Sequence, residues 1–333
     1  MTFQTTILPS NHHYPIETDE TILEAALKHG YTLPYSCRDG ACGACKGKVV
    51  QGLVDHGKAQ AHALSDTEKA AGMALFCCAK PLSDVTIECR EVSMANDIQV
   101  KTLPCRVEQM LKVAEDVMVL KLRLPANERL QFLAGQYIDI LLKDQKPRSF
   151  SLANAPHDDS FLELHVRNIA GGAFTHHVFN EMKERDILRV KGPLGTFFLR
   201  EDSDKPMIFV ASGTGFAPVK SVIEHALYVG IKRPIHLYWG VRKQSDLYML
   251  DTIRAWEAQG VKFSPVVSDE VWDGRGGFVH QAVLEDFADL SGHEVYACGA
   301  PVVVEAAYRD FTAQRGLPGE AFFSDAFTFA PKS

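Results

Sequence analysis

Cys37-Arg38-Asp39-Gly40-Ala41-Cys42-Gly43-Ala44-Cys45 is the stretch that decides the fold of the N-terminal part of the chain, and Cys77 follows it. The spacing is C-x4-C-x2-C, then a long gap and a further cysteine. Glycine reaches backbone angles that are closed to other residues, so Gly40 and Gly43 allow a tight loop with inward-pointing amides. Four cysteinates at this spacing hold a [2Fe–2S] centre. The predicted ligands are Cys37, Cys42, Cys45 and Cys77.

Zinc and disulfide bonds are the alternatives for these cysteines. A zinc site usually combines two separated C-x2-C or cysteine–histidine pairs, whereas this loop contains one such pair. Disulfides occur mainly in exported proteins, and residues 1–4 begin neither the basic nor the apolar region of a signal peptide. We therefore expect a cluster in a cytoplasmic protein, with Cys78, Cys89 and Cys105 as small buried apolar residues.

Length and composition restrict the class of protein. A chain of 333 residues is expected to form two or three domains. Its 46% hydrophobic and 23% charged residues are typical of globular proteins with well-formed cores. The net charge of −7 argues against a nucleic-acid partner. No run of about 18 apolar residues occurs, which argues against a membrane-spanning helix.

The N-terminal domain is predicted over residues 1–90 as a small β-rich fold with two helices. Thr21 is suited to cap the first helix, and Ser65 with Glu68 forms a capping box before the second. The next residues, 91–101, are mostly polar or small and show no periodicity. They are predicted to form a linker to the rest of the chain.

The second domain is predicted over residues 102–202 as an antiparallel β-barrel. Alternating strands are expected over 117–124, 136–142 and 161–166, and short strands with few helices between them are typical of barrels. Its end is marked by a change of pattern at about residue 203.

The third domain, residues 203–333, alternates between strand and helix patterns, the layout of a doubly wound nucleotide-binding fold. Residues 207–210 form a continuous apolar strand, as in a parallel sheet. Gly213-Thr214-Gly215 follows, with Pro218 in the first turn of the next helix. Such small residues let a backbone approach a diphosphate, although the third glycine of G-x-G-x-x-G is missing. A later helix is expected from about Asp246.

Two motifs in the barrel contain candidate cofactor-binding residues. Arg148-Ser149-Phe150-Ser151 offers a guanidinium for a phosphate and a hydroxyl for a ring edge. His165-Val166-Arg167 precedes a glycine pair, and a helix that begins after Gly172 with the Thr175 hydroxyl nearby suits a pyrophosphate. Each motif alone is weak, because an arginine in a strand is more often a solvated surface residue.

Taken together, Arg148-x-Phe150-Ser151, Gly213-Thr214-Gly215-x-x-Pro218 and Cys298-Gly299-x-Pro301 resemble the ferredoxin-NADP reductase superfamily. The N-terminal cysteines sit where plant-type ferredoxins of the β-grasp fold have them, so the resemblance covers nearly the whole chain. Within the superfamily, the chain is most similar to the CDP-6-deoxy-Δ3,4-glucoseen reductases of dideoxysugar biosynthesis. Reductase components of aromatic-ring dioxygenases look similar too. The segments that favour the former are 135–139, 152–156, 278–286 and 322–327.

The resemblance also assigns roles to single residues. In the family the fourth ligand follows a Leu-x pair. Leu75-Phe76-Cys77 fits this pattern, so the resemblance implies Cys77 rather than Cys78 as the ligand. The barrel strand of Arg148, Phe150 and Ser151 would bind FAD, with Phe150 where the family usually has tyrosine. The remaining implied roles are nicotinamide dinucleotide binding at Gly213, Thr214, Gly215, Pro218 and Gly299, hydride-transfer geometry at Cys298, flavin cover at Phe327 and an acidic neighbour at Asp325.

The implied route of electrons runs from NAD(P)H through FAD and the [2Fe–2S] centre to a partner protein, a dehydratase or an oxygenase component. NADH is expected over NADPH. After the second strand of the third domain, Arg242 and Lys243 favour a 2′-phosphate and Asp246 disfavours it, so the resemblance decides. A stand-alone flavin or dye reductase and a non-catalytic ferredoxin-like module are the alternatives, and the complete nucleotide loops count against the module.

Overall fold

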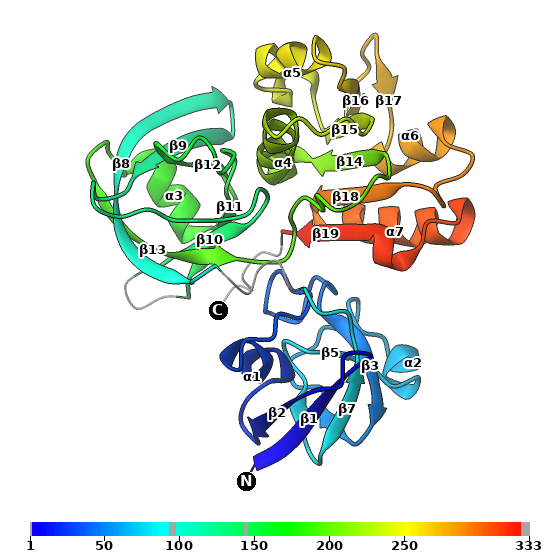
Figure 1. Cartoon of the computed structure of the whole chain (residues 1–333). Helices are drawn as coiled ribbons and strands as arrows, with labels where there is room; N and C mark the ends of the chain where they lie inside the picture. The colour runs from blue at the N-terminus through cyan, green and yellow to red at the C-terminus, as the bar shows by residue number, and fades with distance from the viewer. Residues whose placement is uncertain (1, 93–97, 143–145, 328–333) are drawn as a thin grey trace. The chain divides into compact units, whose positions relative to one another are not determined.

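The computed structural model describes residues 2–92, 98–142 and 146–327 (Figure 1). The chain divides into two compact units, one formed by the residues through Gln99 together with Ala326 and Phe327, and one formed by Val100–Asp325. Residues 93–97 of the predicted linker lie outside the described residues, and Lys101, its last residue, already belongs to a strand.

The N-terminal unit is a β-grasp fold, as predicted. Its main sheet has five strands in the order β2-β1-β7-β3-β5, with β1 antiparallel to β2 and parallel to β7. The elements are β1 (Thr2–Leu8), β2 (His12–Glu17), α1 (Ile22–Lys28), β3 (Lys46–Gln51), β4 (Val54–Asp55), α2 (Asp66–Ala70), β5 (Met73–Leu75), β6 (Lys80–Pro81) and β7 (Val85–Glu88).

Both helices of this unit begin at the predicted caps. The Thr21 hydroxyl accepts a hydrogen bond from the Glu24 amide at 3.2 Å, and the Glu24 carboxylate accepts one from the Thr21 amide at 3.0 Å. Ser65 and Glu68 form the same capping box before α2. Helix α1 then buries one apolar face against the sheet, which gives this unit a hydrophobic core of its own.

The first part of the second unit is a nearly closed antiparallel barrel. Six strands pair in the order β11-β10-β13-β8-β9-β12, and a bridge between Leu152 and Leu164 connects the two edges. The barrel was predicted, but β8 was not, because two β-bulges interrupt its alternation. The elements are β8 (Lys101–Ala114), β9 (Val117–Arg123), β10 (Tyr137–Ile140), β11 (Arg148–Ser151), β12 (Leu162–Arg167), α3 (Ala173–Asn180) and β13 (Ile187–Leu194).

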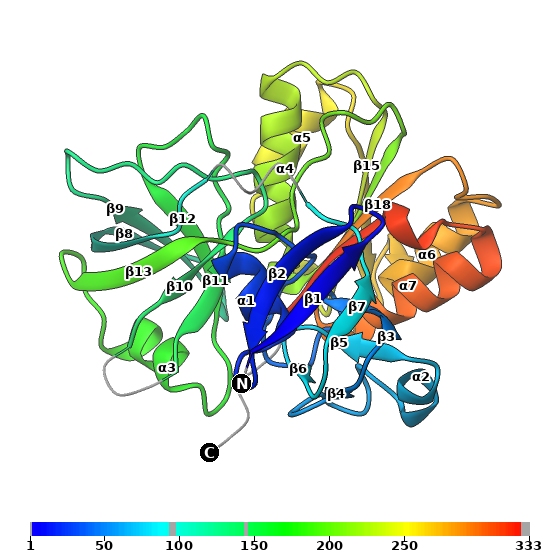
Figure 2. The ribbon, with the colours of Figure 1, turned by 60° about the horizontal axis from the view of Figure 1, so that its bottom comes forward.

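The second part of this unit is a doubly wound α/β fold, as predicted. Its sheet has the order β17-β16-β15-β14-β18-β19, with parallel pairing from β17 to β18. Helices α4 and α5 lie on one side of the sheet and α6 and α7 on the other (Figure 2). The elements are β14 (Met207–Ser212), α4 (Phe216–Tyr228), β15 (Ile235–Val241), α5 (Leu250–Glu257), β16 (Lys262–Val267), β17 (Arg275–Gly276), α6 (Val279–Asp286), β18 (Glu294–Gly299), α7 (Pro301–Arg315) and β19 (Phe322–Ala326).

One helix of this part begins later than predicted. Asp246 does not open a helix but ends a short 3-10 turn, in which its carboxylate accepts a hydrogen bond from the Lys243 amide at 3.1 Å. Helix α5 starts four residues later, at Leu250. Asp246 therefore stays near the end of β15, where its charge can influence a bound nucleotide.

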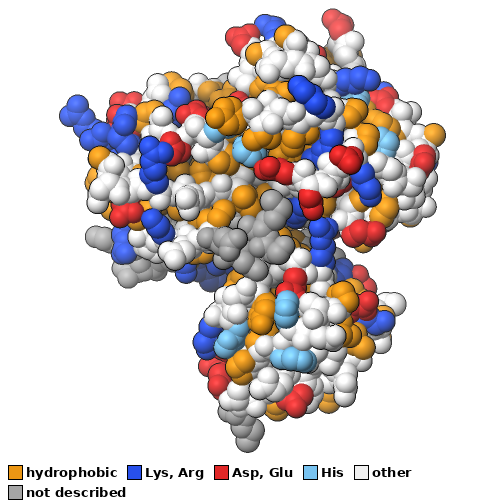
Figure 3. Space-filling model, viewed as in Figure 1, with side chains coloured by type: hydrophobic (Ala, Val, Ile, Leu, Met, Phe, Trp, Pro, Cys, Tyr) orange, Lys and Arg blue, Asp and Glu red, His pale blue; other side chains and the backbone are white. Residues whose placement is uncertain are grey.

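The surface carries charges of both signs. Acidic and basic side chains are interspersed on the face shown in Figure 3. Within residues 2–92, 98–142 and 146–327, no helix has the length and hydropathy needed to cross a bilayer.

Candidate functional site

The cysteine loop of the N-terminal unit has the backbone geometry expected of a cluster-binding loop. Gly40 and Gly43 have φ angles of 71° and 74°, which favour glycine. The Asp39 amide points at Cys37 and lies 3.4 Å from its sulfur. Amides directed at a thiolate stabilise its negative charge, and such hydrogen bonds also tune iron–sulfur centres.

The four predicted ligands approach one another as two pairs of thiols. The sulfurs of Cys37 and Cys42 are hydrogen-bonded, and this contact is the main reason that the pKa of Cys37 falls to about 6. A similar contact joins Cys45 to Cys77 and is the main cause that lowers the pKa of Cys77 to about 3. A [2Fe–2S] centre takes two protein ligands on each of its two irons, so the paired donors fit it.

Three such side chains do not converge on one point anywhere in the described part of the chain, as a single metal ion would require.

Cys78 occupies a different place from its neighbour Cys77. Its sulfur lies 3.6 Å from the Cys77 sulfur and turns toward the loop, where a Cβ added to Gly40 would approach it to 2.6 Å. The Cys77 sulfur contacts the sulfur of Cys45 and also accepts a hydrogen bond from the Gly40 amide of the loop. The geometry favours Cys77 as the fourth ligand and Cys78 as a packing residue beneath the loop.

We expect Cys77→Ser to bleach the visible absorbance of the cluster and Cys78→Ser to leave it in place. The reason is that only the first substitution removes one of the paired thiolates. Absorbance and iron content of the two purified variants, measured side by side, check this prediction. The reverse result would assign the fourth ligand to Cys78.

The glycine loop of the second unit lies where the ends of two neighbouring strands meet. Strands β14 and β18 pair in parallel, and their carboxyl ends are the predicted nucleotide-binding edge. A Cβ on Gly215 would lie 2.1 Å from the Cys298 carbonyl oxygen, and one on Gly299 would lie 2.5 Å from the Ser212 carbonyl oxygen. Glycine is therefore required by this close approach of the two backbones.

The other predicted residues of this loop are buried around it. Gly213 has a φ of 54°, and its carbonyl accepts a hydrogen bond from the Trp239 indole at 2.9 Å. Thr214 lies in the short 3-10 turn before α4, and Pro218 is the third residue of that helix. The loop thus presents backbone at a helix start, as a diphosphate site requires.

Cys298, Asp325 and Ser151 come together although they are far apart in sequence. The Ser151 hydroxyl donates to the Asp325 carboxylate at 3.2 Å, and both residues are buried. Burial, and secondly the charge of Asp325, raise the pKa of Cys298 well above its usual value. Cys298 is therefore a neutral thiol at pH 7, suited to shaping a site rather than to attack as a thiolate. Phe327, one residue beyond β19, is half-buried.

An open cavity lies at the start of α3. The cavity has a volume of about 390 Å³ and is lined by residues 168–173 and His176. Gly172 caps α3, and the Thr175 hydroxyl turns inward to the carbonyl of Gly172 at 3.1 Å. Thr175 thus shapes the turn, and the amides at the helix start are the groups that suit a pyrophosphate.

Arg148 and Phe150 lie on β11, which ends at Ser151. The Arg148 guanidinium donates hydrogen bonds to two carbonyls of its own neighbours, Lys146 at 2.6 Å and Pro147 at 3.3 Å. The ring of Phe150 packs against Phe174, with 5.4 Å between centroids. The arginine is half-buried, and within the described residues it forms no ion pair with an acidic side chain, which fits a residue that binds a phosphate.

We expect Arg148→Ala to lose FAD while the protein stays folded. An arginine that binds a cofactor phosphate makes charge-assisted bonds that no neighbour replaces. The purified variant should be red-brown from the cluster alone, and its flavin content should fall while its circular dichroism remains that of a folded protein; its melting temperature should match that of the FAD-depleted parent. Full FAD occupancy would make Arg148 a surface residue.

His165 has a structural role that the sequence did not predict. Its Nδ1 accepts a hydrogen bond from the Tyr248 hydroxyl at 3.1 Å, and its Nε2 lies 3.1 Å from the Glu163 carboxylate. Burial lowers the pKa of His165, so a neutral ring is favoured. The contact with Tyr248 therefore joins the barrel to the α/β part, whereas the contact with Glu163 stays within β12.

The same contact includes a residue that sequence reasoning missed. Lys220 of α4 is buried, and its ammonium lies 3.3 Å from Glu163 and 2.9 Å from Glu224. In the sequence, Lys220 could have been recognised as a buried, paired residue because it interrupts the otherwise apolar first half of a helix. A buried lysine is almost always paired, and here the pair fixes α4, which begins at the glycine loop, against the barrel.

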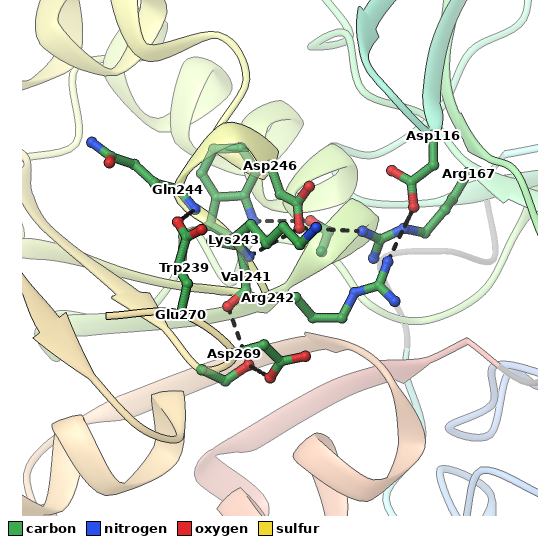
Figure 4. A network of polar contacts seen from close by, with 12 residues as sticks. Asp116, Arg167, Trp239, Val241, Arg242, Lys243, Gln244, Asp246, Asp269 and Glu270 are labelled. Atoms are coloured by element: carbon green, nitrogen blue, oxygen red, sulfur yellow. Dashed lines mark hydrogen bonds and ion pairs between the residues drawn. The ribbon is translucent and has the colours of Figure 1, made fainter. Parts of the chain in front are cut away.

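Arg167 contacts the glycine loop, and a network of charges extends from it to the end of β15 (Figure 4). Its Nε donates to the Asp116 carboxylate at 2.8 Å, and a Cβ on Gly213 would lie 2.4 Å from its Nη1. Arg242, the residue after β15, donates to the same oxygen of Asp116 at 3.2 Å. The Asp246 carboxylate lies 3.9 Å from Arg167. Arg167 and Arg242 are thus both paired with the Asp116 carboxylate, and Arg167 also lies near Asp246.

We expect a higher catalytic efficiency with NADH than with NADPH. Acidic side chains near the end of the second strand oppose a 2′-phosphate, and Arg242, which would favour it, is paired with Asp116. Initial rates with both coenzymes and ferricyanide as acceptor measure the ratio. A higher efficiency with NADPH would contradict this assignment.

Three family profiles match successive parts of the chain. The 2Fe-2S iron-sulfur cluster binding domain matches residues 5–82, the oxidoreductase FAD-binding domain 104–199 and the oxidoreductase NAD-binding domain 209–309. The three domains correspond to the three cofactors predicted from the sequence, and they follow one another in the predicted order.

Named relatives match along their whole length. The CDP-6-deoxy-L-threo-D-glycero-4-hexulose-3-dehydrase reductase of Yersinia pseudotuberculosis is 43% identical over 98% of this chain and 99% of the relative. Reductase component 2 of the terephthalate 1,2-dioxygenase of Comamonas sp. is 34% identical over 99% of both. The crystal structure of the Amycolatopsis cytochrome P450 reductase GcoB superposes with a TM-score of 0.78 at 35% identity, over 98% of this chain and 99% of that one.

The identities, the three domains and the folds agree with one another. The chain therefore belongs to the ferredoxin-NAD(P) reductase superfamily, as a single-chain iron–sulfur flavoprotein oxidoreductase that transfers electrons from NADH through FAD and a [2Fe–2S] cluster.

Proposed function

We propose that this chain delivers electrons in the cytoplasm to a partner dehydrase that acts on a CDP-6-deoxyhexulose, in dideoxysugar biosynthesis. The observation that supports this partner is the 43% identity to a dehydrase reductase, against 34% to a dioxygenase reductase component, each over nearly the full length. An oxygenase component is the second candidate, and the similarity to the P450 reductase favours it.

The proposed flavin and nicotinamide chemistry is assigned to residues of Val100–Asp325 and to Phe327, which follows that unit in the chain. Bound FAD supplies the exchange between a hydride and single electrons. Gly215 and Gly299 let the nucleotide approach the ends of β14 and β18, and Arg148 would neutralise a phosphate of FAD. The neutral thiol of Cys298 beside Asp325 would hold the nicotinamide in line for transfer, and Phe327 would cover the flavin in its absence.

A reconstituted electron-transfer assay tests the proposal. The purified chain is mixed with NADH and either the dehydrase that the Yersinia relative serves or the terephthalate dioxygenase oxygenase component. We expect NADH oxidation that depends on the dehydrase and its sugar substrate, at a rate above that with the oxygenase. Faster transfer to the oxygenase would contradict the dehydrase as partner, and transfer to neither, with ferricyanide reduction intact, would favour a stand-alone flavin or dye reductase.

A further inference from the structure

The end of β15 is the place where a doubly wound fold distinguishes NADH from NADPH. An acidic side chain there accepts a hydrogen bond from the ribose 2′-hydroxyl, whereas an arginine accommodates a 2′-phosphate. Arg242 directly follows β15, and 60% of its side chain is exposed. Taken alone, Arg242 would adapt this chain to NADPH.

Asp116 reaches this position from the barrel. It lies in the turn between β8 and β9, and its backbone carbonyl accepts a hydrogen bond from the Asn168 amide at 2.8 Å. The adjacent residue, Val117, is paired with Arg167 in the β9–β12 ladder. The turn is therefore fixed by the barrel, and its carboxylate is directed at the α/β part without depending on the nucleotide loops.

One oxygen of Asp116 serves two arginines. Arg167 donates to it at 2.8 Å and Arg242 at 3.2 Å (Figure 4). A single exposed ion pair is weak. Here, however, the carboxylate is also bound to Arg167, whose side chain is only 22% exposed. The carboxylate is thus held in place before Arg242 pairs with it.

The surrounding charges add to this effect. At the end of β16, the Asp269 amide donates to the Arg242 carbonyl at 2.9 Å, which places Asp269 beside that residue. The carboxylate of Glu270 accepts a hydrogen bond from the Gln244 amide. A 2′-phosphate would have to displace Asp116 from Arg242 and remain close to these carboxylates, whereas a 2′-hydroxyl carries no charge for them to repel.

We propose that Asp116 is a specificity-determining residue, which selects NADH against NADPH by holding Arg242 and by opposing the 2′-phosphate. The inference deepens the electron-transfer function and rests on it only in that a nicotinamide dinucleotide binds at this edge. The acidic residue sits in the flavin-binding barrel, so coenzyme choice depends on a contact between the barrel and the α/β part.

Asp116→Asn tests the proposal, because asparagine keeps the shape and an acceptor for Arg167 but removes the charge. We expect the ratio of kcat/KM for NADPH to that for NADH, with ferricyanide as acceptor, to rise about tenfold, the effect of one charge-assisted hydrogen bond. Adding Arg242→Ala to this variant should cancel the rise. Asp251→Asn is the matched control, since it removes an equal charge from α5, where Asp251 pairs with Arg254 at 2.9 Å.

An unchanged ratio in Asp116→Asn, or an equal loss with both coenzymes, would overturn the proposal. If the Asp116→Asn variant loses FAD or unfolds, the same ratio is measured for Arg242→Gln in the otherwise unchanged protein, and this result tests the proposal. We then expect the ratio to change by less than about twofold, as for a weak exposed pair, because Arg242 is held by Asp116. A large fall with NADPH alone would show that Arg242 already binds the 2′-phosphate. A parent protein that prefers NADPH would contradict the NADH preference, whereas the change in ratio tests Asp116 separately.

Discussion

Cys42→Ser is expected to lower the rate of cytochrome c reduction strongly while NADH-dependent ferricyanide reduction continues. Cys42 is paired with Cys37, and these two thiols would hold the cluster from one side, so replacing the Cys42 thiol with the weaker hydroxyl donor of serine would destabilise it. Without a stable cluster, the electrons have no exit site from which a bulky one-electron acceptor can take them. We expect the rate of cytochrome c reduction to fall at least about tenfold, which is the scale of effect seen when residues that support a metal site are replaced.

Ferricyanide reduction should survive because the second unit has its own core. The barrel buries a separate hydrophobic cluster, and the compact unit of Val100–Asp325 contains both the barrel and the nucleotide loops. Cys89→Ser is the matched control, as it changes a cysteine of the same unit outside the cluster loop. Loss of both activities in Cys42→Ser would show that the two units are not independent. Survival of both would show that electrons leave from the flavin.

Gly215→Ala is expected to remove most NADH-dependent activity with every acceptor. The new Cβ would meet the carbonyl of Cys298 at 2.1 Å and the Cα of Gly299 at 2.8 Å. These contacts are backbone atoms of a neighbouring strand end, so one of the two loops must move. A displacement of about 1 Å at a hydride-transfer site can lower the rate about 100-fold, and the overpacking is expected to cost about 1–3 kcal/mol of stability.

The measurements are kcat/KM for NADH, FAD content, cluster absorbance and thermal unfolding. Gly292→Ala is the matched control, because a Cβ there meets no atom within 4 Å. The cluster should remain in both variants, since the loop lies in the second unit. Full activity of Gly215→Ala with NADH would mean that the loops at the ends of β14 and β18 do not need their close approach.

Features that depend on neighbours in sequence were predictable. The cysteine spacing, the caps at Thr21 and Ser65 and the strand–loop–helix pattern around Gly213 are each set within a few residues. Strand β8 was missed because its two bulges move side chains to the other face and hide the alternation.

Features that depend on packing between distant segments were not predictable. His165 is predicted to bind a cofactor, but its contact with Tyr248, 83 residues away, could not be predicted from the sequence. The role of Asp116 could not be predicted from the sequence, because it depends on a contact with Arg242 in the other part of the same unit. Such pairs appear only when the barrel and the α/β fold are seen together.

The central claim is that electrons from NADH reach the cluster through the flavin as part of turnover. Rapid mixing of the purified, oxidised protein with NADH under anaerobic conditions tests it directly, with flavin and cluster absorbance followed on the same trace. The account predicts that flavin bleaching comes first and that cluster bleaching follows at a rate no slower than steady-state turnover with cytochrome c. A cluster that stays oxidised, or bleaches far more slowly than turnover, would contradict it.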